Sequence, residues 1–167
     1  PGYGLSPLPA DFSFDLVAGA GVELIRAQGT AQNVVHGHSM GGQISSRIRM
    51  KAPELVHGLV ISSTIGYFAN STREEQEEFV RKRTAPPPPG TDPVTVNRMI
   101  VDSMLGPTSR GGEVDLVRQW ASLTPPDTVK AAVKAVQTYP EAEAIAGFKS
   151  IAIPTLLVAG AVDQVGH

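Results

Sequence analysis

A glycine-rich turn between a short strand and a helix constrains the fold of this sequence more than any other feature. Asn33-Val34-Val35-His36 predicts the strand, and Gly37-His38-Ser39-Met40-Gly41-Gly42 follows it at once. Beyond the glycines, apolar residues recur every four positions, at Met40, Ile44 and Ile48, until Pro53 ends the pattern. The sequence therefore predicts a strand, a sharp turn and a helix in direct succession.

Two more apolar runs, Val56–Ile61 and Pro154–Gly160, are continuous rather than alternating. Strands of this kind, separated by helices, are typical of a parallel sheet covered on both faces. A helix from about Asp11 to Gln28 precedes the first strand. The residues predicted to form its buried stripe are Leu16, Val17, Ala20, Leu24 and Ile25. The predicted fold class is α/β with a parallel sheet.

The sequence between the second and third predicted strands is a long insert of helical patterns without a clear strand. We expect residues 1–65 to form the first part of a core, residues 66–149 a helical cap, and residues 150–167 the rest of the core. Ser71 and Glu74 match a capping box for a helix that reaches about Arg83. Because charges of both signs dominate that helix, we interpret it as exposed to solvent and stabilised by ion pairs between its own residues.

The composition excludes several classes of function. The 167 residues carry a net charge of −2, so no basic surface attracts the phosphates of nucleic acid. Cysteine is absent and the four histidines lack the spacing of a helical zinc site, so we expect no metal site. No apolar run is long enough to span a bilayer, and the first residues do not resemble a secretory signal. We expect a cytoplasmic protein with no nucleic-acid or membrane partner.

Residues 37–41 complete the pattern G-x-S-x-G in the strand-to-helix context that a nucleophilic serine requires. We expect Ser39 to adopt a strained backbone conformation, which the small neighbours Gly37 and Gly41 permit. Its hydroxyl would project from the sheet toward the N-terminus of the helix. The backbone N–H of Met40 would then donate to the oxyanion that forms when Ser39 attacks a carbonyl group.

A serine nucleophile needs a base that accepts its proton and an acid that orients the base. In this arrangement the acid follows the serine in the chain and the histidine comes last. Asp163 stands just beyond the third predicted strand, at the carboxyl end, where the sites of parallel sheets gather. The segment after the second strand, Ser62–Gly66, contains no carboxylate. Asp163 is therefore the predicted acid, and an ordinary turn aspartate is the alternative interpretation.

The histidines of the sequence fit the role of the base poorly. His38 adjoins Ser39, but neighbouring side chains diverge at a sharp turn, so we expect His38 to have a packing role. We expect His36 to face a covering helix and His57 to be exposed at the entry of the second strand. His167 closely follows Asp163, whereas a further parallel strand needs a crossover of about a dozen residues or more. We expect the base to lie past His167, with His167 itself as the alternative.

Several segments, taken in order, resemble the α/β-hydrolase family, in particular its serine esterases and hydrolases with a helical cap. Pro1–Ser6 resembles the family's loop after the fourth strand, residues 33–42 its fifth strand and serine turn, and Pro53–Val60 the run into its sixth strand. Residues 153–163 resemble its seventh strand and acid loop. The resemblance implies an α/β-hydrolase core truncated at both ends. The second oxyanion donor would precede this chain and the catalytic histidine would follow it.

The resemblance implies hydrolysis of an ester, or of a related acyl or carbon–carbon bond, of a small molecule through an acyl-Ser39 intermediate, without a cofactor. A serine rather than an aspartate at this position points away from the family's dehalogenases and epoxide hydrolases. The alternative is a non-catalytic protein of the same fold that binds a small ligand under its cap. We expect the chain by itself to be inactive, and we expect Met99, Met104 and Trp120 to form the core of the cap rather than the wall of a pocket.

Overall fold

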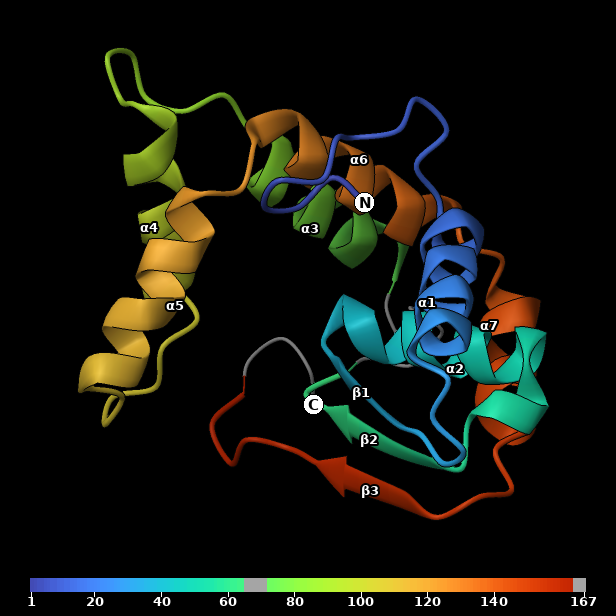
Figure 1. Ribbon diagram of the computed structural model, residues 1–167. Coiled ribbons are helices and arrows are strands. Elements are labelled where there is room, and N and C mark those ends of the chain that lie inside the picture. The colour runs from blue at the N-terminus through green and yellow to red at the C-terminus, as the bar shows by residue number, and fades with distance from the viewer. Residues whose placement is uncertain (65–71, 164–167) are drawn as a thin grey trace.

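The computed structural model describes residues 1–64 and 72–163 (Figure 1). The elements of these residues, in chain order, are α1 (Phe14–Gln28), β1 (Val34–His38), α2 (Met40–Lys51), the short 3-10 helix η1 (Pro53–Leu55), β2 (Gly58–Ser62), α3 (Arg73–Thr84), α4 (Pro93–Asp102), α5 (Gly112–Ser122), α6 (Pro126–Thr138), α7 (Glu141–Lys149) and β3 (Thr155–Val158). Among the described helices, none combines the length and the apolar character that a membrane span requires.

The described strands form one parallel sheet in the order β1-β2-β3. Val35 of β1 is paired with Leu59 of β2, and Ile61 of β2 with Leu157 of β3. Each strand lies within a few residues of its predicted position, so the prediction of a parallel α/β sheet is confirmed. Because the strands are parallel, the turns that follow them meet at one edge of the sheet.

Helices α1, α2 and α7 cover one face of the sheet (Figure 1). Phe148 of α7 packs against the core on this face. The buried residues of this core are Ala18, Val22, Ile48, Ala52, Val56, Leu59 and Ile61. All of them are apolar, so this layer of helices and the sheet share one continuous hydrophobic core.

The predicted buried stripe of α1 is wrong in part: Ile25 packs against the core as predicted, but the fully buried residues are others. Phe14, Ala18 and Val22 are the buried residues of this helix, whereas Leu24 is 61% exposed. The reason is the close approach of α1 to α2: a Cβ atom on Gly21 would lie 2.6 Å from Cδ1 of Ile48. Small residues therefore face α2, and the larger leucine is turned toward solvent.

No described helix covers the opposite face of the sheet, so the prediction of cover on both faces is wrong for the described residues. Val34 and all of β3 are exposed. His36 is also exposed on this face rather than placed under a helix, since side chains alternate along a strand and Val35 points into the core. The Oγ atom of Ser62 lies 3.0 Å from Nε2 of His36 and 3.1 Å from Nδ1 of His38.

Between β2 and β3 the described residues form helices and no strand, as predicted. Helix α3 packs on α6, and α4 packs on α5. Buried Asn97 holds the second pair together, because its side-chain amide donates to the carbonyl oxygens of Ala121 and Thr124, at 2.9 Å each. Helix α7 packs instead on α2 of the core. The division of the chain at residues 65 and 149 stays a prediction.

The capping box of α3 lies one residue later than predicted. The hydroxyl of Thr72 accepts the backbone N–H of Glu75 at 3.2 Å, and the Glu75 carboxylate accepts the backbone N–H of Thr72 at 2.7 Å. The sequence contains the same spacing twice, at Ser71 and Glu74 and at Thr72 and Glu75, so the pattern alone does not fix the first turn. Ser71 lies outside the described residues.

Arg47 of α2 ties the three core helices together. Its Nε lies 2.7 Å from the carboxylate of Asp15 in α1, and its guanidinium also pairs with Glu143 of α7. The same guanidinium lies 5.4 Å from the centre of the Tyr139 ring. Lys51 adds a second cation 2.9 Å from Asp15, and together the two cations hold the pKa of the Asp15 carboxyl well below its usual value of 3.8.

We predict that Asp15→Asn lowers the free energy of unfolding near pH 7 by about 1 kcal/mol, the upper end of the range for exposed ion pairs. The folded state depresses the pKa of Asp15, so its contribution is full above the unfolded value of 3.8 and is lost as the pH falls through the folded value. The difference between wild type and variant should therefore shrink steadily from about pH 5 to pH 2 in urea titrations.

Glu23→Gln is the matched control, because Glu23 lies on the same helix in an exposed ion pair with Arg26. It should change the free energy of unfolding little at any pH. A difference between wild type and Asp15→Asn that stays constant down to pH 2 would contradict the assignment.

Candidate functional site

The turn between β1 and α2 places Ser39 in a strained conformation. Its φ is 51° and its ψ is −122°, a region that residues with a side chain rarely adopt. Such a conformation costs on the order of 1 to 3 kcal/mol and persists only where the surroundings determine it. The strained backbone expected at Ser39 is therefore present.

Hydrogen bonds from the neighbouring strand fix this conformation. The N–H of Ser39 donates to the carbonyl of Ser62 at 2.9 Å, and the hydroxyl of Thr64 donates to the carbonyl of Ser39, also at 2.9 Å. The N–H of Ser63, which itself has a φ of 46°, donates to the carbonyl of Val158 in β3 at 2.9 Å. The turn after β1 is thus hydrogen-bonded to the end of β2 and the turn that follows it, and that turn is hydrogen-bonded to β3.

Two glycines allow the turn after β1 to pack closely on the start of α2 and on Thr64. One of the two is not a glycine for which the sequence predicts a steric need. A Cβ atom on Gly37 would lie 2.2 Å from the carbonyl oxygen of Gly41, so no side chain fits there. Among the described residues outside its own helix, no atom lies within 4 Å of a Cβ atom on Gly41, whereas a Cβ atom on Gly42 would lie 2.1 Å from Oγ1 of Thr64. The steric need expected of Gly37 is confirmed, that of Gly41 is wrong, and Gly42 has the need instead.

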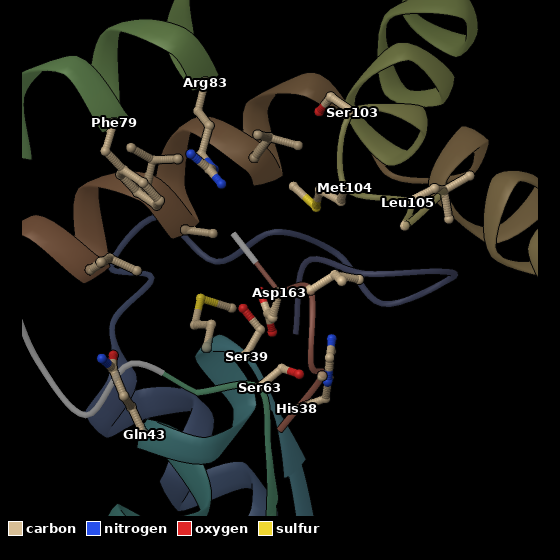
Figure 2. Close-up of a pocket in the computed structure, with 18 of the residues that line it drawn as sticks. His38, Ser39, Gln43, Ser63, Phe79, Arg83, Ser103, Met104, Leu105 and Asp163 are labelled. Carbon is tan, nitrogen blue, oxygen red and sulfur yellow. The ribbon is translucent and has the colours of Figure 1, made fainter. Parts of the chain in front are cut away.

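A cavity of about 500 Å³ opens above the carboxyl ends of the strands. Its floor consists of the turns that follow β1, β2 and β3, and its roof consists of α3, α6 and the segment after α4 (Figure 2). This volume is within the range of small-molecule sites, and the roof is mainly apolar. The apolar roof residues include Met104, Leu105, Val129, Val133 and Val136.

The predicted site residues Ser39, Met40 and Asp163 all line this cavity. Figure 2 shows the Ser39 hydroxyl and the Asp163 carboxylate in the same part of the cavity. Met40 is the first residue of α2, so its N–H has no acceptor within the helix and lies at the positive end of the helix dipole. Asp163 follows β3 in a turn that its own N–H closes on the carbonyl of Gly160 at 3.2 Å.

Among the histidines that the structure describes, only His38 lines the cavity. Its Nδ1 lies 3.1 Å from Oγ of Ser62 and its side chain is exposed, so the packing role predicted for His38 is wrong. His57 is exposed, as expected, and its Nδ1 accepts the backbone N–H of Asn33 at 3.3 Å. His167 lies outside the described residues.

The large apolar residues of the insert divide differently from the prediction. Met104 lines the cavity, whereas Met99 and Trp120 do not. Met99 is 56% exposed and Trp120 is 61% exposed, so neither forms the core of the insert. The α4–α5 pair is held through the amide of Asn97 rather than through these side chains.

Most of the cavity residues are not predicted from the sequence, and Tyr3, Phe79 and Arg83 are among them. Phe79 and Arg83 belong to α3, for which the charge pattern predicts a solvated helix. The guanidinium of Arg83 lies 3.7 Å from the centre of the Phe79 ring. A signal was available, since Phe79 is the only aromatic residue of that charged helix and Arg83 follows it at the spacing that brings side chains together. Partial burial raises the pKa of the Tyr3 hydroxyl.

Within residues 1–64 and 72–163, no group of three or more histidine, aspartate or glutamate side chains is arranged to hold a metal ion. The polar groups that the described residues offer to the cavity include hydroxyl, carboxylate, guanidinium, imidazole, side-chain amide and backbone N–H groups.

The sequence was compared with models of known protein families and with curated proteins. The model of the alpha/beta hydrolase family matches residues 1–167. Among curated proteins, no relative with significant similarity to the sequence was found.

Solved structures share the fold at low sequence identity. A hydrolase from Pseudomonas aeruginosa PA01 is 20% identical with a TM-score of 0.76, and a thermophilic esterase from Thermogutta terrifontis is 22% identical with a TM-score of 0.75. An esterase from Exiguobacterium antarcticum is 17% identical with a TM-score of 0.79. In each case 99% of this chain is covered, and the chain spans only 60 to 62% of the other protein.

We predict that alanine at the two adjacent glycines of the turn has opposite effects on stability. Gly42→Ala forces a Cβ against Thr64 and should lower the free energy of unfolding by about 1 to 3 kcal/mol, the usual cost of overpacking. Gly41→Ala adds a Cβ in open space on a helix and should raise it by about 0.4 to 1 kcal/mol. Chemical denaturation of the full-length variants measures both, and equal effects of the two substitutions would refute this account of the turn.

Proposed function

The chain belongs to the alpha/beta hydrolase family, and from this membership we propose that the protein is a serine hydrolase. It would cleave an ester, or a related acyl or carbon–carbon bond, of a small molecule through an acyl-Ser39 intermediate. The observation that carries the proposal is the strained backbone of Ser39 at the floor of the cavity and at the start of α2. A protein that only binds a ligand has no use for this strain.

Ser39 has the environment of a nucleophile in this proposal. Its side chain faces the cavity, and it stands at the N-terminal end of α2, where the helix dipole favours a developing negative charge (Figure 2). The hydroxyl attacks the substrate carbonyl carbon, and its proton passes to a histidine base. The charge that develops on the carbonyl oxygen is stabilised by the N–H of Met40.

Asp163 would orient the histidine base in the correct tautomer and stabilise its protonated form. Its support is position: it follows β3 at the same edge of the sheet as Ser39 and lines the same cavity. The base itself lies outside residues 1–64 and 72–163, either as His167 or as a histidine later in the full-length protein. The protonated base then donates to the leaving alcohol, and a water molecule hydrolyses the acyl-serine ester by the same steps in reverse order.

We predict that Ser39→Ala in the full-length protein lowers the turnover of p-nitrophenyl esters by at least about 10⁴-fold, because no other group replaces the nucleophile. The melting temperature should not fall, since Ser39 is exposed and its backbone hydrogen bonds do not need the hydroxyl. Ser63→Ala is the control, because Ser63 lines the same cavity and also has a positive φ. A loss in Ser63→Ala as large as that in Ser39→Ala would count against the assignment.

We predict that Asp163→Asn lowers the rate of acylation by something on the order of 10⁴-fold, the effect of holding the wrong imidazole tautomer. Substrate binding should be retained. Asp127→Asn, at an exposed aspartate of α6 that pairs with Lys130, makes the same chemical change away from the cavity and should have no effect. Single-turnover kinetics separates binding from acylation, and a loss smaller than about tenfold in Asp163→Asn would place the acid elsewhere.

A further inference from the structure

We propose that Arg83 is the group that binds a carboxylate of the substrate, so that the preferred substrates of this hydrolase are esters that carry a negative charge at a distance from the bond that is cleaved. This inference deepens the proposed function and rests on it. It assigns Arg83 a role in specificity and no part in the chemical step.

The position of Arg83 is the first argument. It lies in the last turn of α3, and Figure 2 shows its side chain reaching from the roof into the cavity, on the side opposite Ser39. The guanidinium rests on the ring of Phe79, with its central carbon 3.7 Å from the ring centre. Stacking on an aromatic ring fixes the plane of the guanidinium and leaves its N–H donors at the edge of that plane free to meet a ligand.

The other charged residues of α3 are paired with one another. Arg73 pairs with Glu77, and Arg81 and Lys82 both pair with Glu78. Arg83 forms no ion pair with any acidic residue that the structure describes. Burial lowers the pKa of the Arg83 guanidinium, and no described charge shifts that pKa in the other direction. Asp163, the carboxylate in the floor of the cavity, therefore does not neutralise it.

The surroundings strengthen the interaction that an incoming carboxylate would make. Helix α3 packs on α6, which contributes apolar side chains to the same roof, including Val129, Val133 and Val136. A partly desolvated charge without a partner is unfavourable, and a ligand of opposite charge relieves that cost. Because a guanidinium stays protonated at any physiological pH, the site remains positive in spite of its burial.

A carboxylate fits this site better than a phosphate does. The planar fork of an arginine matches the two oxygens of a carboxylate in a bidentate pair. Among the described residues that line the cavity, Arg83 is the only lysine or arginine, so it can pair with one carboxylate group of a ligand. The test places the carboxylate on each side of the scissile bond in turn.

The test compares matched pairs of esters in the full-length protein. For the acyl side, 4-nitrophenyl hydrogen glutarate is compared with 4-nitrophenyl pentanoate, and for the alcohol side, 4-acetoxybutanoate is compared with butyl acetate. For at least one pair, wild type should prefer the charged ester. In Arg83→Gln, the ratio of kcat/KM for that charged ester to kcat/KM for its neutral partner should fall at least tenfold.

Arg81→Gln is the matched control, because it removes the same charge from the same helix at an exposed position outside the cavity. It should leave the ratio unchanged, which separates a direct contact from a change in the overall field. If the ratio falls less than tenfold in Arg83→Gln for both pairs, or falls equally in Arg81→Gln, the inference is overturned while the proposed function stands.

Binding of glutarate, measured by calorimetry, gives a readout that does not depend on turnover. Wild type should bind glutarate at least tenfold more tightly than Arg83→Gln, and inorganic phosphate should show no such difference. If wild type hydrolyses none of the four esters but glutarate binding still depends on Arg83, the serine hydrolase proposal fails and the anion site remains. If glutarate binding does not depend on Arg83, the anion site is overturned.

Discussion

The strained backbone of Ser39 is the constraint on which the rest of the structure depends. A φ of 51° at a residue with a side chain is unfavourable, so several contacts must act together to hold it. The carbonyl of Ser62 accepts the N–H of Ser39, and the hydroxyl of Thr64 donates to the carbonyl of Ser39. The absence of a side chain at Gly42 leaves space for Thr64. These contacts require β1 and β2 to be parallel neighbours, because only then do their following turns meet.

The cavity above this turn depends on contacts that are distant in the sequence. The buried hydroxyl of Thr128 in α6 donates to the carbonyl of Gly2 at 2.6 Å, which fastens the roof of the cavity to the first residues of the chain. Tyr3 follows directly and lines the cavity. On the covered face of the sheet, Arg47 joins α1, α2 and α7. The floor and the roof of the cavity are thus positioned by separate polar contacts, and Arg83 faces Ser39 across the space between them.

Local patterns in the sequence predicted the parallel sheet and the sharp turn, because strand, glycine and helix signals are short-range. They did not predict the features that depend on which elements meet. The buried face of α1 follows from the contact of Gly21 with Ile48, and the need for glycine falls on Gly42 rather than Gly41 because Thr64 arrives from another strand. In the sequence, Arg83 resembles the other charged residues of α3. Its place in the cavity wall follows from the packing of α3 on α6.

The most direct test of the central claim is to label the full-length protein with a fluorophosphonate and to map the modified residue by mass spectrometry. The reagent reacts with a serine only where the hydroxyl is activated and the oxyanion is stabilised. The account predicts a single adduct on Ser39. An adduct on Ser45, Ser62 or Ser63 instead, or no adduct in a folded protein, would contradict it.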